Sequence, residues 1–312
     1  MDLGGTKLLA GAVAEDLSVH HRARRPVHGI DQAQLVEMCV QAVEEASAAV
    51  GGEVDAVGLG IPCTFDRRTG MAVQAVNLPL HDLPFAAVMH ERLGLPVTVD
   101  NDGNCSALAE ARFGVGRGTG DLVMLTIGTG IGSGMVLGGV LYRGWIGGGA
   151  EIGHMVVDID GPPCQGNCPN WGCLESVASG SALVREVALR VGRRPDTAIG
   201  RALEAGVELT GPLVTELAYE GDPVAREAIG VVGARLGVGV ANVVNIFNPE
   251  VVAIGGGVIA AGELLLAPVR EVMLRRALAP GRDVVRVEAA AFGAEAGMVG
   301  AAVLAREELM AR

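Results

Sequence analysis

"DLVMLTIGTGIGSGMVLGGVLYRG", residues 121–144, is the stretch that decides the fold, because it joins two apolar strands through a glycine-rich turn. The chain opens in a similar way with "DLGGTKLLAGAVAEDL", residues 2–17, in which a glycine turn leads into an apolar strand. Two halves that begin alike indicate a duplicated fold. We expect the two glycine turns to face one another across a central cleft.

Helical and strand patterns alternate around these turns. In chain order, the expected elements are helix 32–50, strand 54–62, helix 86–95, strand 96–102, helix 103–114, and strands 251–258 and 284–293 within a mainly helical tail. This alternation predicts a layered α/β fold. The glycine-rich stretch "FGVGRGTG" at 113–120 is the candidate hinge.

The composition excludes several classes of protein. At 312 residues the chain is long enough for two domains, each with its own core. Its 24 basic and 36 acidic residues give a net charge of −12, which argues against bulk electrostatic binding to nucleic acid or to an anionic membrane. We found neither a signal-peptide pattern nor a run of about 18 uninterrupted apolar residues. These features predict a soluble, cytoplasmic protein.

Three glycine-rich stretches are candidates for binding a nucleotide. In "DLGGTK" and "IGTGIGSG", backbone amides and a hydroxyl can approach phosphate oxygens closely, although neither has the spacing of a Walker A or dinucleotide-binding loop. The third, "GGG", permits close approach of a flat ring such as adenine. Alone, the first turn fits a tight hairpin equally well, and the triple glycine fits close packing on a helix. The candidate residues are Asp2, Gly4, Gly5, Thr6, Lys7, Gly128, Thr129, Gly130, Gly132, Gly255, Gly256 and Gly257.

Two aspartates mark a second type of site in "VDNDGNCSALAE", residues 99–110. Asp100 and Asp102 stand at the junction of a strand and a helix, where α/β proteins bind ligands. Either aspartate, or Asn101 between them, could instead be a helix N-cap.

A metal-binding pattern lies in "HMVVDIDGPPCQGNCPNWGCLE", residues 154–175. The candidate ligands, one nitrogen and three sulfurs as in a structural zinc site, are His154, Cys164, Cys168 and Cys173. A disulfide with one free thiol is the less favoured alternative in a reducing compartment. Glu151 and Glu175 flank the cluster, so the metal is expected to shape a site between two carboxylates. The other cysteines are expected in the core, and these are Cys39, Cys63 and Cys105.

These motifs together resemble the ROK family of sugar kinases and related repressors, along residues 2 to about 300. "DLGGTK" and "IGTGIGSG" are similar to its phosphate motifs, "EIGH" to its sugar-binding motif, and the cysteine run with "GCLE" to its zinc motif. "DND" resembles the family's Glu-Asn-Asp. Within the family, "GCLESVASGSALVREV", residues 172–187, is most similar to bacterial glucokinases.

The resemblance implies an actin-like (ribonuclease-H-like) duplicated fold with two domains. These would be a small α/β domain at 1–115, on which a C-terminal helix at about 294–312 packs back, and a large α/β domain at 116–293 that carries the zinc loop. It also implies ATP, Mg²⁺ and structural Zn²⁺ as cofactors, and a homodimer or homotetramer. Of the possible hexoses, glucose is favoured, with N-acetylglucosamine, N-acetylmannosamine or fructose as alternatives, and polyphosphate as an alternative donor.

The resemblance also assigns roles to residues. Asp102 would be the catalytic base, and Asp2 the carboxylate near Mg²⁺. The first two glycine turns would hold the phosphates and the triple glycine the adenine. The sugar ligands would be Asn101, Glu151, His154 and Glu175, with Asn77, Gly60 and Pro62 as weaker candidates. Because both glycine turns are remote in sequence from the zinc loop, loss of a zinc ligand is expected to weaken sugar binding much more than nucleotide binding.

This chain departs from the family pattern in three places. Cys164 and Cys168 are separated by three residues where the family usually has Cys-x-Cys. Asp100 replaces a glutamate, which should matter little if its role is packing. The motif "DLGGTK" begins at residue 2, so we expect either a truncated first strand or a start codon that was placed too late. Two alternative functions remain. A sugar-responsive repressor of the family would need an N-terminal helix-turn-helix. A non-catalytic, zinc-stabilised binding module would not explain why Asp102 occurs together with two phosphate-type turns.

Overall fold

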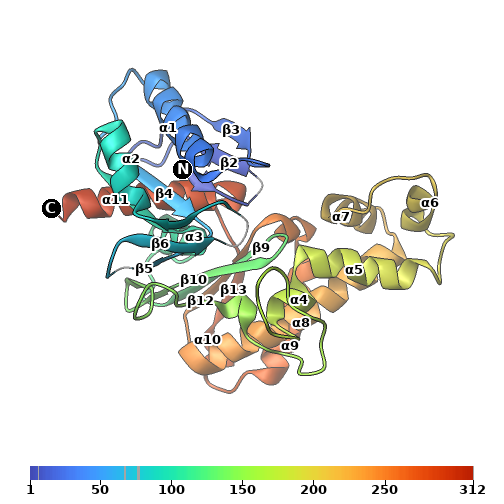
Figure 1. Cartoon of the computed structure of the whole chain (residues 1–312). Helices are drawn as coiled ribbons and strands as arrows, with labels where there is room; N and C mark the ends of the chain where they lie inside the picture. The colour runs from blue at the N-terminus through green and yellow to red at the C-terminus, as the bar shows by residue number, and fades with distance from the viewer. Residues whose placement is uncertain (6, 67, 76–77, 312) are drawn as a thin grey trace. The chain divides into compact units, whose positions relative to one another are not determined.

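The computed structural model describes residues 1–5, 7–66, 68–75 and 78–311 (Figure 1). Contacts divide the chain into two compact units. Unit 1 consists of Met1–Gly118, Gly134–Ala150 and Ala291–Arg312. Unit 2 consists of Thr119–Ser133 and Glu151–Ala290. The units are defined by contacts alone, so the domain boundary expected between residues 115 and 116 stays a prediction.

The main sheet of unit 1 has the strand order β3-β2-β1-β4-β8. Its strands are β1 (Asp2–Leu3), β2 (Lys7–Ala10), β3 (Ala23–Pro26), β4 (Val57–Ile61) and β8 (Val97–Asn101). The first three strands pair antiparallel, whereas β4 pairs parallel to both β1 and β8. The first strand, β1, has two residues.

A second sheet repeats this plan in the order β11-β10-β9-β12-β13. Its strands are β9 (Leu122–Ile127), β10 (Ile131–Leu137), β11 (Val140–Tyr142), β12 (Val251–Gly255) and β13 (Arg286–Ala289). Here too a hairpin, β10–β11, is antiparallel and β12 pairs parallel to both neighbours, β9 and β13. Strand β10 begins in unit 2 and ends in unit 1. The equal strand orders confirm the predicted duplication.

Local capping explains where the helices of unit 1 begin and end. Helix α1 (Gln32–Ala49) starts at a capping box, in which Asp31 and Gln34 each accept a hydrogen bond from the other's backbone. Helix α2 (Phe85–Leu93) ends at Gly94, which has a positive φ of 66°. A small third sheet of β5 (Cys63–Asp66), β6 (Met71–Ala75) and β7 (His81–Leu83) was not predicted from the sequence.

Unit 2 is covered by helices. They are η1 (Ile152–His154), α4 (Leu174–Ala178), α5 (Gly180–Val191), α6 (Ala198–Glu204), α7 (Gly211–Tyr219), α8 (Pro223–Phe247), η2 (Gly257–Ala261), α9 (Glu263–Arg276) and α10 (Gly281–Val284). Helix α8 is long and apolar enough to cross a membrane by length and composition, but 56% of its most apolar window is buried. The core helix of a soluble protein has the same properties, so this is weak evidence for a membrane span.

The C-terminal helix α11 (Ala296–Met310), preceded by η3 (Gly293–Glu295), packs within unit 1 against β4 and α3 (Asp102–Phe113) (Figure 1). Two glycines permit this close approach. A Cβ added at Gly58 of β4 would lie 1.8 Å from the carbonyl oxygen of Ala301, and one added at Gly300 would lie 1.7 Å from that of Cys105. The three isolated cysteines are buried, as predicted.

Replacing Gly300 by alanine should therefore destabilise the protein. The added methyl group meets backbone rather than a movable side chain, so we expect a loss of about 3 kcal/mol of unfolding free energy in urea titration. Gly230→Ala on α8 is a matched control, because its Cβ would meet nothing within 4 Å. Alanine favours a helix over glycine by up to about 1 kcal/mol, so this variant should gain stability. Equal stability of both variants would contradict the packing of α11.

Candidate functional site

The four predicted metal ligands lie together in unit 2. Their ligand atoms, from His154, Cys164, Cys168 and Cys173, are all within 4.8 Å of one another. The Sγ of Cys164 is 3.5 Å from Nδ1 of His154, and the Sγ atoms of Cys168 and Cys173 are 3.9 Å apart. Zinc–sulfur bonds of about 2.3 Å and zinc–nitrogen bonds of about 2.0 Å give tetrahedral edges of about 3.5–3.8 Å. The donor set and its spacing therefore fit a zinc ion.

Glycines and backbone bridges shape the loop that carries these ligands. Gly172 has a φ of 66°, and a Cβ there would lie 1.5 Å from the carbonyl oxygen of Asp158. Isolated antiparallel bridges join Val156 to Cys173 and Pro163 to Trp171. These constraints bring the start and the end of the loop together, which explains how ligands spread over twenty residues meet.

Glu175 lies in the first turn of α4, two residues after the last cysteine ligand. Its Oε1 is 3.8 Å from the Sγ of Cys164, and its Oε2 accepts a hydrogen bond of 2.7 Å from the backbone N–H of Ile131. Desolvation raises the pKa of the neighbouring Glu151, and the charge of Glu175 adds to this rise. Glu151 thus interacts electrostatically with the metal ligand His154 and with Glu175.

The second glycine turn, which joins β9 to β10, also contacts the metal loop. A Cβ at Gly130 would lie 2.2 Å from Oε2 of Glu175, so a larger residue there would displace that carboxylate. The amide nitrogen of Gln165, a residue of the metal loop, donates to the carbonyl oxygen of Thr129 at 3.2 Å. Gly132 is constrained independently, because a Cβ there would lie 2.5 Å from Oγ1 of Thr126. This turn is thus remote from the metal loop in sequence, as stated above, but it contacts that loop in the structure.

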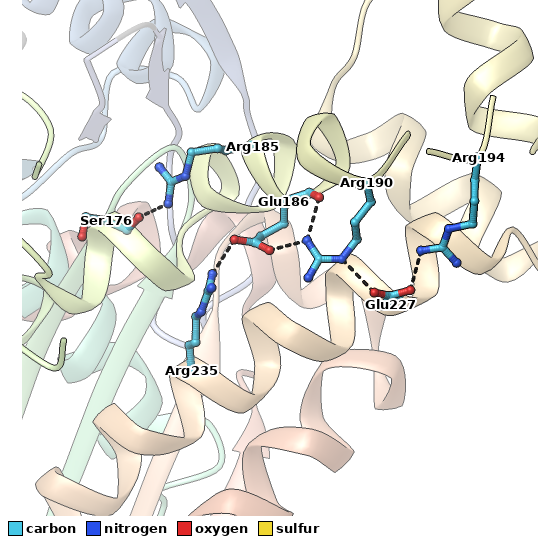
Figure 2. Close-up of polar contacts among 7 residues, drawn as sticks. All are labelled: Ser176, Arg185, Glu186, Arg190, Arg194, Glu227 and Arg235. Atoms are coloured by element: carbon cyan, nitrogen blue, oxygen red, sulfur yellow. Dashed lines mark hydrogen bonds and ion pairs between the residues drawn. The ribbon is translucent and has the colours of Figure 1, made fainter. Parts of the chain in front are cut away.

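Polar contacts hold α4 and α5 on helix α8 (Figure 2). The guanidinium of Arg185 donates to the carbonyl oxygen of Ser176, next to Glu175. The buried carboxylate of Glu186 accepts from Arg190 and, at 2.6 Å, from Arg235 of α8. These two arginines hold the pKa of Glu186 low against the opposing effect of burial. The short helix that carries Glu175 is thereby fixed on the body of unit 2.

In unit 1, the "DND" segment joins β8 to α3. Asn101 is the N-cap of α3, since its Oδ1 accepts from the N–H groups of Gly103 at 2.8 Å and Asn104 at 3.4 Å. Asp102 is the first residue of the helix. The N-cap alternative is thus confirmed for Asn101, and contact of its side chain with a sugar stays a prediction.

Asp100 does more than pack. It is buried and accepts hydrogen bonds from Nε of Arg143 at 2.5 Å, from Nδ2 of Asn104 at 2.8 Å, and from the backbone N–H of Asn101 at 2.8 Å. The exchange of the family's glutamate for aspartate was expected to matter little if the role of this residue is packing, and these polar contacts do not meet that condition. Arg143 was missed from the sequence, and no periodic pattern marks it as a partner. The aspartate anchors the segment that ends in Asp102.

The first glycine turn is a tight hairpin in which the N–H of Gly4 donates to the carbonyl oxygen of Lys7 at 2.8 Å. Burial raises the pKa of Asp2 in β1, and the N-terminal amine and Lys7 partly offset this rise. A Cβ at Gly297 of α11 would lie 2.7 Å from the Asp2 carboxyl carbon. Gly5 follows in the same turn, whereas the predicted sites Thr6 and Asn77 lie outside the described residues.

Packing explains several of the remaining glycines. A Cβ at Gly60 would lie 3.2 Å from the Sγ of Cys105, and Pro62 follows directly after β4. Gly256 has a φ of 84°, and its Cβ would lie 2.5 Å from the carbonyl oxygen of Ile127. A Cβ at Gly255 would lie 2.6 Å from Cε of Met124, whereas a Cβ at Gly257 would meet nothing within 4 Å. Close packing thus accounts for the first two of the three glycines, and Gly257 retains room for a ligand.

Comparison with known proteins defines the class of this one. A family model described as "ROK family" matches residues 1–308. The chain therefore belongs to the ROK family, and it has the actin-like, ribonuclease-H-like duplicated fold of the family's sugar kinases. The two glycine turns and the metal loop all lie within the residues that match the family model.

Among particular relatives, the chain is 37% identical over 313 residues to a glucokinase from Streptomyces coelicolor, covering 98% of this chain and 96% of that protein. The structure of a ROK family glucokinase from Streptomyces griseus, in complex with glucose and AMPPNP, matches with a TM-score of 0.88 and 36% identity, and 98% of each chain is covered. A xylose repressor from Caldicellulosiruptor bescii is 33% identical over 254 residues, covering 81% of this chain and 62% of that protein.

Proposed function

We propose that this chain is a glucokinase that transfers the γ-phosphoryl group of ATP to the 6-hydroxyl of glucose. The observation that carries the proposal is the full-length similarity, at 36% identity and a TM-score of 0.88, to the Streptomyces griseus glucokinase solved with glucose and AMPPNP. The spacing of the zinc-type ligands and the N-terminal position of Asp102 on α3 support it.

The proposed reaction needs positioning and charge neutralisation more than covalent chemistry from the protein. Asp102 accepts the proton of the 6-hydroxyl, the sugar oxygen forms a bond to the γ-phosphorus, and the bond from phosphorus to the bridging oxygen breaks to release ADP. The sugar ligands would be Asn101, Glu151, His154 and Glu175, with the candidates Asn77, Gly60 and Pro62 around them. Of these residues, Glu151, His154 and Glu175 belong to unit 2, whereas Asp102 belongs to unit 1.

The glycine turns would bind the nucleotide, with the phosphates at the first two and the adenine near Gly257. Asp2 is our candidate for the carboxylate near Mg²⁺, directly or through water, since that ion prefers oxygen ligands. A zinc ion on the His154 and cysteine cluster would supply no chemistry to the transfer and would hold Glu175 in place. A cytoplasmic location and a homodimer or homotetramer complete the proposal, with neither nucleic acid nor membrane as a partner.

A panel of sugars and phosphate donors tests this function. We expect ADP release with glucose and ATP, and kcat/KM for glucose at least about tenfold above that for the other hexoses, because a pocket built to hydrogen-bond one set of hydroxyls leaves its polar groups unpaired with another. The panel includes N-acetylglucosamine, N-acetylmannosamine and fructose, with polyphosphate as second donor. Preference for one of these would change the substrate within the family.

The alternative is a non-catalytic sugar-sensing protein, which similarity to the xylose repressor favours. Binding of glucose, measured by calorimetry, without phosphoryl transfer from any donor would support this alternative and contradict the kinase.

A further inference from the structure

The carbonyl oxygen of Thr129, at the exposed tip of the second glycine turn, accepts two side-chain hydrogen bonds. One comes from Oγ of Ser181 at 2.9 Å and the other from Nε2 of Gln165 at 3.2 Å. The same nitrogen of Gln165 also lies 3.2 Å from Oγ of Ser179, the N-cap of α5. A carbonyl oxygen can only accept, so the group of Gln165 that faces Thr129 is its NH₂. Both of its hydrogens thus have an acceptor.

The direction of one peptide group follows from this contact. The bond between Thr129 and Gly130 is trans, because the only cis peptide among the described residues precedes Pro280. In a planar trans peptide the C=O and the N–H point in opposite directions. Donors that fix the Thr129 carbonyl toward α5 and the metal loop therefore direct the N–H of Gly130 away from them.

The preceding peptide is held in the same way. The carbonyl oxygen of Gly128 accepts from the backbone N–H of Gly180 at 2.8 Å, which directs the N–H of Thr129 away from α5. Successive N–H groups that point to one side form a local positive potential suited to a phosphate. The turn is thus oriented by donors on α5 and on the metal loop.

We propose that Gln165 is a positioning residue for the phosphate donor: it holds the Thr129 carbonyl so that the Gly130 amide can donate to a phosphate oxygen. This inference rests on the proposed function, in which the second turn binds the phosphates of ATP. It gives a role to the longer spacing between Cys164 and Cys168, because Gln165 lies between these two metal ligands. The metal loop then serves the donor as well as the sugar.

The test compares Gln165→Glu with Gln165→Ala. Glutamate keeps the shape of the side chain but, when ionised, can only accept, and it adds a negative charge near the phosphates. Loss of one neutral hydrogen bond corresponds to about two- to tenfold in affinity, so we expect that weakening of AMPPNP binding in Gln165→Ala and a larger one in Gln165→Glu. The matched control is Asn167→Ala, an exposed asparagine on the same loop, which should bind as the wild type does.

Three further readouts separate positioning from general damage. The KM for glucose, the zinc content per chain and the melting temperature should match the wild type in all three variants. AMPPNP affinity that is unchanged in both Gln165 variants would overturn the inference, and so would a rise in the KM for glucose as large as the loss of nucleotide affinity. A wild type that phosphorylates glucose while the variants bind AMPPNP equally well rejects this inference alone. A wild type that binds no AMPPNP rejects it together with the proposed function.

Discussion

The Asp102→Asn variant is expected to lose turnover by a factor of about 10²–10⁴, the range that general acid–base catalysis contributes, while glucose still binds. Asparagine keeps the size of the side chain and most of its hydrogen bonding but cannot accept the proton of the sugar hydroxyl. Because Asp102 is the first residue of α3, and Asn101 rather than Asp102 caps that helix, the helix should remain intact. Steady-state kinetics and calorimetric titration with glucose measure the two effects separately.

Asp31→Asn is a matched control for this variant. Asp31 also stands at the start of a helix in unit 1, where it caps α1. Asparagine is about as good an N-cap as aspartate, so this exchange should leave both turnover and stability near the wild type. Full turnover in Asp102→Asn would reject the assignment of the base. Loss of glucose binding together with turnover would show that Asp102 holds the sugar instead.

The duplicated sheet could be predicted because its signals are local. Apolar strands and glycine turns occur within residues 2–17 and again within 121–144, and each pattern directly specifies a hairpin. The small sheet of β5, β6 and β7 has no such signal. Its strands have three to five residues, and "HDL" in β7 has no buried residue, so no alternation of apolar and polar positions marks it.

The residue types of the candidate site were predictable, but their partners were not. Asp100 and Arg143 are 43 residues apart in the chain. The separation is 44 residues for Ile131 and Glu175, and 36 residues for Thr129 and Gln165. Such pairs depend on how loops and helices pack, and neither helical nor strand periodicity extends over these distances. The metal ligands differ because their chemistry is distinctive: three thiols and an imidazole within twenty residues indicate a cluster before any fold is known.

The roles of the glycines also could not be predicted from the sequence alone. "GGG" at 255–257 fits both a nucleotide site and close packing, and the sequence contains nothing that separates the two. The backbone does, because the positive φ of Gly256 and its approach to Ile127 require glycine for packing alone. A functional role for this stretch therefore falls mainly on Gly257.

The Cys168→Ser variant is expected to lose its zinc and much of the stability of unit 2. Wild-type protein should contain about one zinc per chain, since three thiolates and an imidazole select that ion over Mg²⁺ or Ca²⁺. We expect the free energy of unfolding to fall by about 3 kcal/mol, which is less than the binding free energy of a structural zinc ion. This loss would lower the melting temperature by about 6–12 °C. Cys63→Ser is a matched control, because Cys63 is buried but outside the cluster, so this variant should keep its zinc.

The kinetic effect of Cys168→Ser should extend to both substrates. Sugar affinity should fall because Glu175 and His154 lose their support, as the sequence already suggested. Nucleotide affinity should fall as well, because Glu175 and Gln165 both contact the second glycine turn. We therefore expect KM values for glucose and for ATP that both rise several-fold, with the larger rise for glucose, whose ligands adjoin the metal. A zinc-free wild type that phosphorylates glucose normally would contradict a structural role for the metal. A KM for ATP that stays at the wild-type value in a zinc-free variant would show that the glycine turn keeps its shape without the loop.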